Sequence, residues 1–341
     1  MIMVKIQDIA KATGYSTTTV SKALNNYTDI SDKAKNKIIM IAKELGYIPN
    51  VHARGLVMKR SFTVGVILDE LLGLGLNHPF FSGLIEAFRA AIEERGYSMI
   101  LISNHIGNTG IGSYLDHCQQ QNVDGVFILC TDHNSESIQQ LIYSDIPIVL
   151  FDIPNKETHS VVSNHFEGAY QATKYLIDLG HHKIAHIYGN AFTYAGSERK
   201  QGFEKALLDA NIALNEDYLV SGGYFDFKYG KRAMEELLKL EDRPSAVFAA
   251  GDIMALGAMQ SCYEHEVRIP DDISIIGFDN IKLLDWITPS LTTIAQDTLQ
   301  LGRECCNVLI DSIEEKKDVA MHKVVATYIV ERKSCAPYHQ V

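Results

Sequence analysis

Residues 6–26 read IQDIAKATGYSTTTVSKALNN, and this stretch has the pattern of two short helices joined by a tight turn. Apolar residues recur at every third or fourth position, which predicts helices over 5–13 and 17–25. Gly14 is suited to end the first helix, and the Ser16 side chain can cap the second. The turn between them has the length that a helix-turn-helix requires.

A third helix is predicted between Ser31, which can cap its start, and Gly46, which can end it. The charge of this region differs from that of the rest of the chain. Residues 1–60 hold ten Lys/Arg and four Asp/Glu, a balance of +6, whereas the remainder holds 21 and 38, a balance of -17. A basic head on an acidic body predicts that only the head approaches nucleic-acid phosphates.

The outer face of the second predicted helix carries short hydrogen-bonding side chains and one long cation. Such side chains can reach base edges and phosphate oxygens without keeping the helix out of the major groove. The alternative is a Ser/Thr-rich exposed helix in a small bundle, but the turn length and the segregated charge favour DNA. The residues concerned are Thr17, Thr18, Thr19, Ser21, Lys22 and Asn25.

From residue 62 onwards, apolar strand-like runs alternate with helical stretches. Four such runs lie within 62–152 and four more within 183–278, each separated by amphipathic segments. This pattern predicts an α/β body of two doubly wound parallel sheets, because a single sheet would be unusually wide. The last predicted pieces, 292–295, 302–314 and 324–331, are too few for a third domain and are expected to cross between the two sheets.

Composition and motifs exclude several other classes of protein. The N-terminus has no signal-peptide pattern and no apolar run could span a membrane, so a cytoplasmic protein is expected. The six cysteines form no C-x-x-C pair or metal-ligand spacing, which predicts free thiols and no metal site. There is no phosphate-binding glycine loop and no G-x-S-x-G nucleophile motif, so neither a cofactor nor catalysis is expected.

Residues 6–26, followed by Gly46-Tyr47-Ile48-Pro49-Asn50, resemble the headpiece of the lac repressor (LacI/GalR) family of bacterial transcription regulators. Further strings that match the family are His78–Phe81, Gly196–Phe203, Ile269–Asp279 and Pro289–Asp297, so the resemblance covers essentially the whole chain. It implies a body of the type I periplasmic-binding-protein-like fold and a homodimer on double-stranded operator DNA. The implied domains are a headpiece over 1–49, a hinge over 50–61 and a body over 62–341, with a first lobe of about 62–162 and 291–321 and a second of about 163–290 and 322–341.

The resemblance also implies roles for individual residues of the headpiece and hinge. Thr17, Thr18 and Lys22 would read bases, while Ser16, Thr19, Ser21 and Asn25 would mainly hold phosphates. The hinge would become helical on DNA, with Asn50, Ala53 and Leu56 as contacts and Leu56 wedged into a minor-groove step. The alternative is a plain linker, because nine residues that include Gly55 cannot hold a helix alone.

Ligands of open α/β sheets bind at the carboxyl ends of strands, and two sheets would here face each other with such ends. Carboxylates and amides accept hydrogen bonds from hydroxyls, and an aromatic ring packs on the apolar face of a sugar. Simpler roles also exist: Asp152 and Asp279 could cap turns, Phe81 could belong to the core and Arg199 could be a solvated cation. The predicted ligand-binding residues are Phe80, Phe81, Asp152, Arg199, Phe225, Asp252, Asp279 and Gln296.

These observations predict a DNA-binding transcriptional regulator, a repressor by family resemblance, controlled by a small sugar-like effector held between the lobes. A purine or nucleoside co-repressor is the alternative within the same mechanism, because Phe225 could stack on a base. A solute-binding protein is the rival from another class, but it would need an export signal and has no use for residues 1–60. An α/β enzyme is a further rival, and it lacks the motifs named above.

Overall fold

The computed structural model describes residues 4–24, 27, 29–47, 60–68, 75–103, 112–130, 135–315 and 319–338. The chain divides into two compact units, Met1–Phe62 and Thr63–Val341. Of the predicted hinge, only residues 60 and 61 are described, so the proposed contacts Asn50, Ala53 and Leu56 lie outside the described residues, as does Asn25. Within the described ranges, no helix is both long and apolar enough to cross a bilayer.

The first unit contains the three predicted helices, α1 (Ile6–Thr13), α2 (Thr17–Leu24) and α3 (Asp32–Glu44). Gly14 ends α1 with a φ of 78°, a left-handed conformation in which its amide donates to the Ala10 carbonyl. The Ser31 hydroxyl caps α3 by accepting a hydrogen bond from the Ala34 amide. The apolar faces of the helices meet in a small core that contains Ile9, Val20, Ala23, Ile38 and Ala42.

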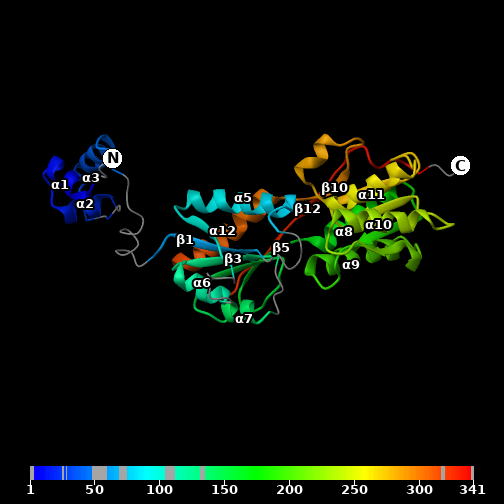
Figure 1. The fold of residues 1–341 in the computed structure, drawn as a ribbon, viewed down its shortest axis with the longest axis horizontal. Helices are drawn as coiled ribbons and strands as arrows, with labels where there is room; N and C mark the ends of the chain where they lie inside the picture. Colours follow the sequence, from blue (N-terminus) through cyan, green and yellow to red (C-terminus); the bar gives the residue numbers. More distant parts are fainter. Residues whose placement is uncertain are drawn as a thin grey trace. The chain divides into compact units, whose positions relative to one another are not determined.

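The first sheet of the body has the strand order β11-β5-β4-β3-β1-β2, and all its neighbours are parallel. Helices α5 (Pro79–Glu94) and α12 (Thr298–Glu315) pack together on one face, and α6 (Tyr114–Gln120) and α7 (Glu136–Ile142) cover the other (Figure 1). The strands are β1 (Thr63–Leu68), β2 (Ser98–Leu101), β3 (Gly125–Leu129), β4 (Ile148–Phe151), β5 (His159–Ser163) and β11 (His322–Val325).

The second sheet has the order β12-β10-β9-β8-β6-β7 and is parallel except for the antiparallel pair β10 and β12. Helix α8 (His165–Asp178) packs against α9 (Tyr194–Asp209), and α10 (Phe227–Leu238) packs against α11 (Asp252–Glu264). The strands are β6 (Ile184–Tyr188), β7 (Leu219–Ser221), β8 (Ala246–Ala249), β9 (Ser274–Asp279), β10 (Thr292–Gln296) and β12 (Thr327–Val330).

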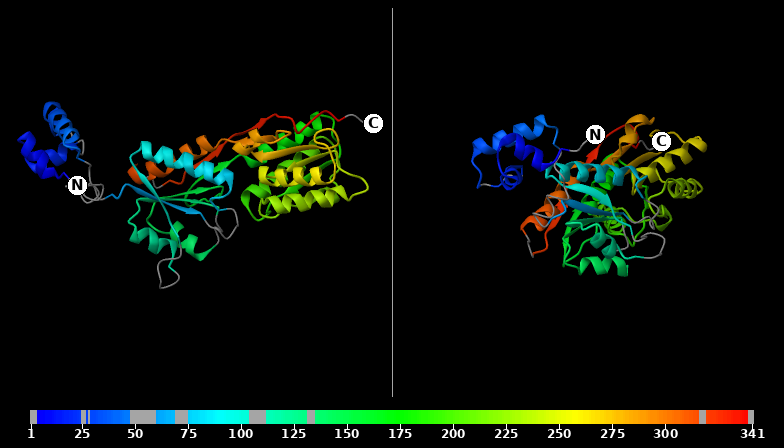
Figure 2. Two further views of the ribbon diagram at one scale, coloured as in Figure 1. Left: turned by 45° about the horizontal axis from the view of Figure 1, so that its top comes forward. Right: turned by 60° about the vertical axis from the view of Figure 1, so that its left-hand side comes forward.

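The chain passes three times between the sheets: after β5, after β10, and between β11 and β12. We call residues 63–163 with 298–325 the first lobe, and residues 164–297 with 326–338 the second lobe. Figure 2 shows the C-terminal part of the chain running from the first lobe into the second. All six cysteines are free thiols, as predicted.

Three details of the predicted body were wrong. The run 291–297 was placed in the first lobe, but β10 pairs with β9 in the second sheet. Residues 322–341 were placed in the second lobe, but β11 (His322–Val325) pairs with β5 in the first sheet, and the chain changes sheet at Ala326. Strand β5 was not predicted. In each case the partner strand, and not the composition of the segment, decides where it lies.

Candidate DNA-binding face and effector site

Helix α2 turns a polar face away from the headpiece core. Thr17 and Thr18 are exposed, while Val20 and Ala23 on the opposite face are buried. Ser16 begins the helix, because its hydroxyl accepts a hydrogen bond from the Thr19 amide at 3.1 Å. The Ser16 hydroxyl also lies 2.8 Å from that of Thr19, so these two predicted phosphate contacts are already joined to each other.

Lys22, the predicted base-reading cation of this face, forms an ion pair with Asp29. Both side chains are largely exposed, at 41% and 55%, so solvent screens the pair. The hydrogen bond from Lys22 lowers the pKa of Asp29, which keeps the carboxylate charged. Asp29 therefore competes with DNA for Lys22.

The body has a buried charged cluster centred on Arg199, which lies on α9. Its guanidinium donates a hydrogen bond to the Ala250 carbonyl after β8 and lies 3.5 Å from Asp279 Oδ1. The guanidinium carbon lies 3.8 Å from the centroid of the Phe278 ring. Burial lowers the pKa of Arg199, and the carboxylates of Asp279, Asp152 and Asp252 oppose that shift. Arg199 is thus not the solvated cation considered above.

Asp279 and Gln296 end the neighbouring strands β9 and β10, and both side chains are buried. Gln296 Nε2 donates a hydrogen bond to Asp279 Oδ1 at 2.7 Å. Among the described residues, Gln296 Oε1 has no hydrogen-bond partner although it is buried. A buried acceptor in this state is suited to a ligand donor.

Phe225 sits beside this cluster, with its ring 5.5 Å from the Arg199 guanidinium carbon. The ring packs against two glycines, Gly189 directly after β6 and Gly251 two residues after the end of β8. A Cβ on Gly189 would lie 2.2 Å from Phe225 Cζ, and one on Gly251 would lie 3.3 Å from Cδ1. Neither glycine was predicted to belong to the site, although a glycine at or just after the end of a predicted strand is the signal that marks them.

The first lobe contributes aromatic residues near the start of α5. Phe80 is buried against Phe151 at a ring distance of 6.0 Å, and half-buried Phe81 packs on Phe80 at 5.2 Å. His78, which was not predicted as a site residue, is also buried and packs on Phe81. Within the part of the chain that is described, neither of its ring nitrogens has a hydrogen-bond partner.

The surroundings of His78 connect it to the Arg199 cluster in the second lobe. Burial lowers the pKa of His78, and the charges of Asp279 and Arg199 act on it in opposite directions. The neutral imidazole offers one donor and one acceptor.

Two predicted ligand residues are engaged inside the protein. Asp252 is fully buried and accepts hydrogen bonds from the Ile281 amide at 3.0 Å and the Thr293 hydroxyl at 2.6 Å. Burial and the neighbouring Asp279 raise the pKa of Asp252 well above its usual range. Asp152 accepts a hydrogen bond from the Ser163 amide at 3.0 Å. A ligand contact by either residue stays a prediction.

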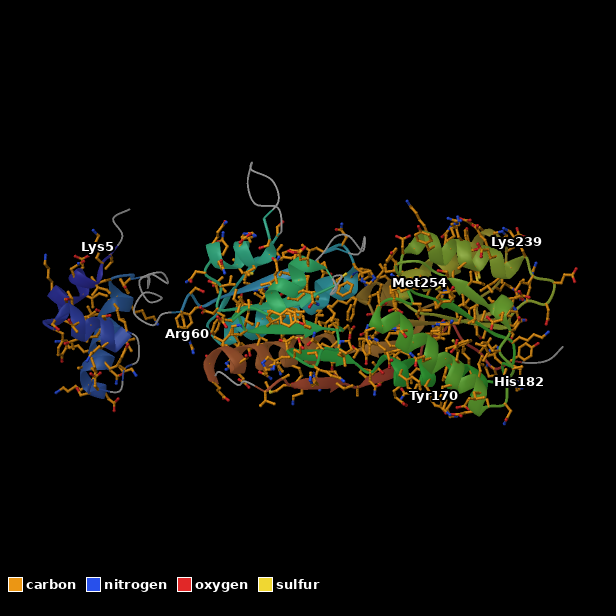
Figure 3. All side chains as sticks on the ribbon, turned by 90° about the horizontal axis from the view of Figure 1, so that it is seen from below. Lys5, Arg60, Tyr170, His182, Lys239 and Met254 are labelled. Atoms are coloured by element: carbon orange, nitrogen blue, oxygen red, sulfur yellow. The ribbon has the colours of Figure 1, made fainter. Side chains whose placement is uncertain are left out.

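The direction of the second sheet places these residues on the side of the first lobe. Figure 3 shows Met254, close behind the end of β8, at the part of the second lobe nearer the first. His182, just before β6, lies at the far end in the same view. The strands of the second sheet therefore point their carboxyl ends towards the first lobe.

Comparisons with known proteins agree with this arrangement. A sequence model described as bacterial regulatory proteins, lacI family, matches residues 5–50, and one described as a periplasmic binding protein-like domain matches residues 173–335. The HTH-type transcriptional repressor PurR of Erwinia tasmaniensis is 37% identical over 342 residues, which cover 98% of each chain. The chain belongs to the lacI family of bacterial regulatory proteins.

Other relatives of this lacI-family protein include PurR of Yersinia enterocolitica, 37% identical over 98% of the chain and 97% of the relative. The lac repressor dimer bound to operator and the anti-inducer ONPF is 25% identical, with a TM-score of 0.78 over 98% and 100% of the two chains. The CelR–cellobiose complex is 29% identical, with a TM-score of 0.71 over 97% and 99%. A LacI family regulator of Enterococcus faecium with bound ribose is 28% identical, with a TM-score of 0.70 over 81% and 100%.

Membership of the lacI family confirms the predicted fold, a helical headpiece joined to a two-lobed α/β body. It also confirms the prediction of a DNA-binding transcriptional regulator. The roles of the individual residues in this lacI-family regulator stay predictions.

Proposed function

We propose that this regulator is a homodimeric repressor whose affinity for a near-palindromic operator is controlled by a sugar-like effector. Residues 1–49 would bind the major groove, residues 50–61 would form the hinge, and residues 62–341 would hold the effector. Two identical heads related by a two-fold axis match two half-sites of a palindrome. The lac repressor dimer on operator, which is similar over nearly the whole chain, supports this assembly.

The observation that carries the effector proposal is the pairing of donors and acceptors around Arg199. Asp279 and Gln296 Oε1 are acceptors, whereas Arg199 only donates. A sugar hydroxyl is both a donor and an acceptor, so adjacent hydroxyls can satisfy this cluster in full. The half-buried ring of Phe225 offers a face for the apolar side of the sugar. The cellobiose and ribose complexes of similar proteins support this class of ligand.

The position of the Phe225 ring also supports a second candidate effector, a purine. An aromatic ring beside a guanidinium can stack on a planar heterocycle as well as on a sugar. The two candidates differ in the groups that would hydrogen-bond to Asp279 and Gln296, because a purine presents ring nitrogens instead of hydroxyls.

The DNA-binding part is tested by retention of the full chain on a fragment of its own promoter region. Three proteins are compared: the wild type, a version without residues 1–60, and the triple variant T17A/T18A/K22A. We expect sequence-selective retention of the wild type alone, in a band that corresponds to a dimer. Equal retention of all three proteins would refute this part of the proposal and favour a solute-binding protein.

The effector is tested by the melting temperature of the full chain with cellobiose, ribose, guanine or hypoxanthine. A ligand that binds only the folded protein raises the melting temperature. We expect the shift with a sugar, its loss in D279N, and its retention in D285N, because Asp285 is an exposed carboxylate outside the cluster. A shift with a purine and none with a sugar would replace the sugar by the purine candidate.

A further inference from the structure

His165 occupies the point where the chain first passes from one lobe into the other. It is the first residue of α8 and follows β5 by only one residue, Asn164. The side chain is almost completely buried, and its ring packs near Tyr194 and Phe278 at 5.9 Å each. A buried imidazole requires partners for its nitrogens, and here both nitrogens face charged groups.

The two nitrogens of His165 face opposite charges from opposite lobes. Nδ1 lies 3.3 Å from Arg199 Nε and 3.2 Å from Arg199 Nη2. Nε2 lies 2.8 Å from Asp152 Oδ2, an ion-pair distance, but among the described residues it forms no hydrogen bond. Asp152 follows β4 and is also bonded to the amide of Ser163 in β5, so it belongs to the first lobe.

This geometry determines which nitrogen carries the proton. The guanidinium of Arg199 has N–H donors only, so Nδ1 must present its lone pair. The proton then resides on Nε2, the nitrogen that lies 2.8 Å from Asp152 Oδ2. A neutral His165 with this tautomer links an anion of the first lobe to a cation of the second.

We propose that His165 is a positioning residue. It holds the Arg199 guanidinium in a fixed orientation relative to Asp152, and so connects the effector cluster to the crossing between the lobes. Among the described residues, the other direct contacts of the Arg199 guanidinium come from the second lobe: the Ala250 carbonyl, Asp279, and the Phe225 and Phe278 rings. Within the described ranges, His165 is thus the side chain that lies directly between Asp152 of the first lobe and the guanidinium, and the Asp152 charge also acts on Arg199. The proposal rests on the proposed function, because the effector is taken to contact Arg199.

The test compares H165F and H165Q with the wild-type full chain. Phenylalanine keeps the ring but loses both nitrogens, whereas glutamine restores a donor and an acceptor. H181F is the matched control, because His181 is a buried histidine of the same lobe whose nitrogens bond Ser245, Ser274 and the Ala336 carbonyl instead. The readouts are the 15N NMR signals of the histidine rings and of Arg199 Nε, followed by effector titration.

We expect a ring protonated at Nε2 for His165, an Arg199 Nε signal displaced in H165F, and partial recovery in H165Q. H181F should leave the Arg199 signal unchanged. Affinity for whichever of cellobiose, ribose, guanine or hypoxanthine binds should fall about tenfold to a hundredfold in H165F, as for a lost hydrogen bond to a charged group. An unchanged Arg199 signal in H165F, or a proton on Nδ1, would overturn the proposal. Failure of all four probes with the wild type would count against the proposed effector, while the NMR signals would still decide the role of His165.

Discussion

The seat of Phe225 on Gly189 leads to a quantitative prediction for G189A. A methyl group there would lie 2.2 Å, 2.4 Å and 2.8 Å from Cζ, Cε1 and Cε2 of the ring. Carbon atoms in contact stay about 3.5–4.0 Å apart, so the ring must move by more than about 1 Å. Because the ring is half-buried and can move towards solvent, we expect a cost of about 1 kcal/mol, at the low end for overpacking. The melting temperature should fall by about 2–4 °C.

The same displacement removes the ring from its place near Arg199, so effector binding should suffer more than stability. We expect the ligand-induced rise in melting temperature, with cellobiose or ribose, to need about tenfold more ligand in G189A. The variants F225A and G189A/F225A isolate the cause, because without the ring the added methyl should cost almost nothing. G83A is the matched control, since a Cβ there meets no atom closer than 3.9 Å. An equal loss from G189A with and without the Phe225 ring would refute the reasoning.

Three further predictions concern other parts of the molecule. D29N frees Lys22 from its ion pair, so operator affinity should rise, measured by retention on the operator at fixed salt; an unchanged affinity would contradict this. Burial lowers the pKa of His186 to about 3. As the pH falls below about 6.5, His186 therefore becomes protonated in the unfolded chain but stays neutral in the folded chain, and the folded state loses stability. Between about pH 7.5 and about pH 5, this proton uptake lowers the free energy of unfolding of the wild type by about 2 kcal/mol. Denaturant titration should show that H186F lacks this part of the pH dependence. An equal pH dependence in the two proteins would count against the prediction. Burial raises the pKa of Asp252, so D252N should be at least as stable as the wild type near neutral pH. D252A should lose about 2–3 kcal/mol of unfolding free energy, because it leaves the Ile281 amide and the Thr293 hydroxyl without their acceptor. Equal losses in the two variants would contradict this.

The headpiece was predictable because its signals are local. The first helix was expected over 5–13 and is found over Ile6–Thr13, with Gly14 in the left-handed conformation that ends it. The cap of α3 by Ser31 is likewise decided within four residues. Such elements depend on neighbours in the chain, and a single sequence contains those neighbours.

Strand β5 was missed because its stability depends on distant residues. Two of its polar side chains are buried through partners more than 150 positions away: His159 bonds the Ser312 hydroxyl at 3.2 Å, and Ser160 bonds His322 at 2.9 Å. In the sequence, a run that begins with His and Ser is typical of a loop. Only the assembled sheet supplies the partners that make it a core strand.

For the effector cluster, the sequence predicted which residues gather but not what they touch. Arg199, Asp279 and Gln296 do lie together, as expected for the carboxyl ends of strands. Asp252 was expected to face a ligand, yet it is bonded to the turn that follows β9. The direction of a side chain depends on tertiary contacts, and for the same reason His78 was not predicted.

The interleaving of the lobes has a consequence for how the protein is made. Strand β5 leaves the ribosome with the first half of the chain, but its outer partner β11 is synthesised about 160 residues later. At about 5–20 residues per second, the edge of the first sheet would stay open for about 8–30 s during translation. An unpaired edge of this kind is a template for pairing with another chain, so the time that β5 waits for β11 during translation should influence the yield of folded protein.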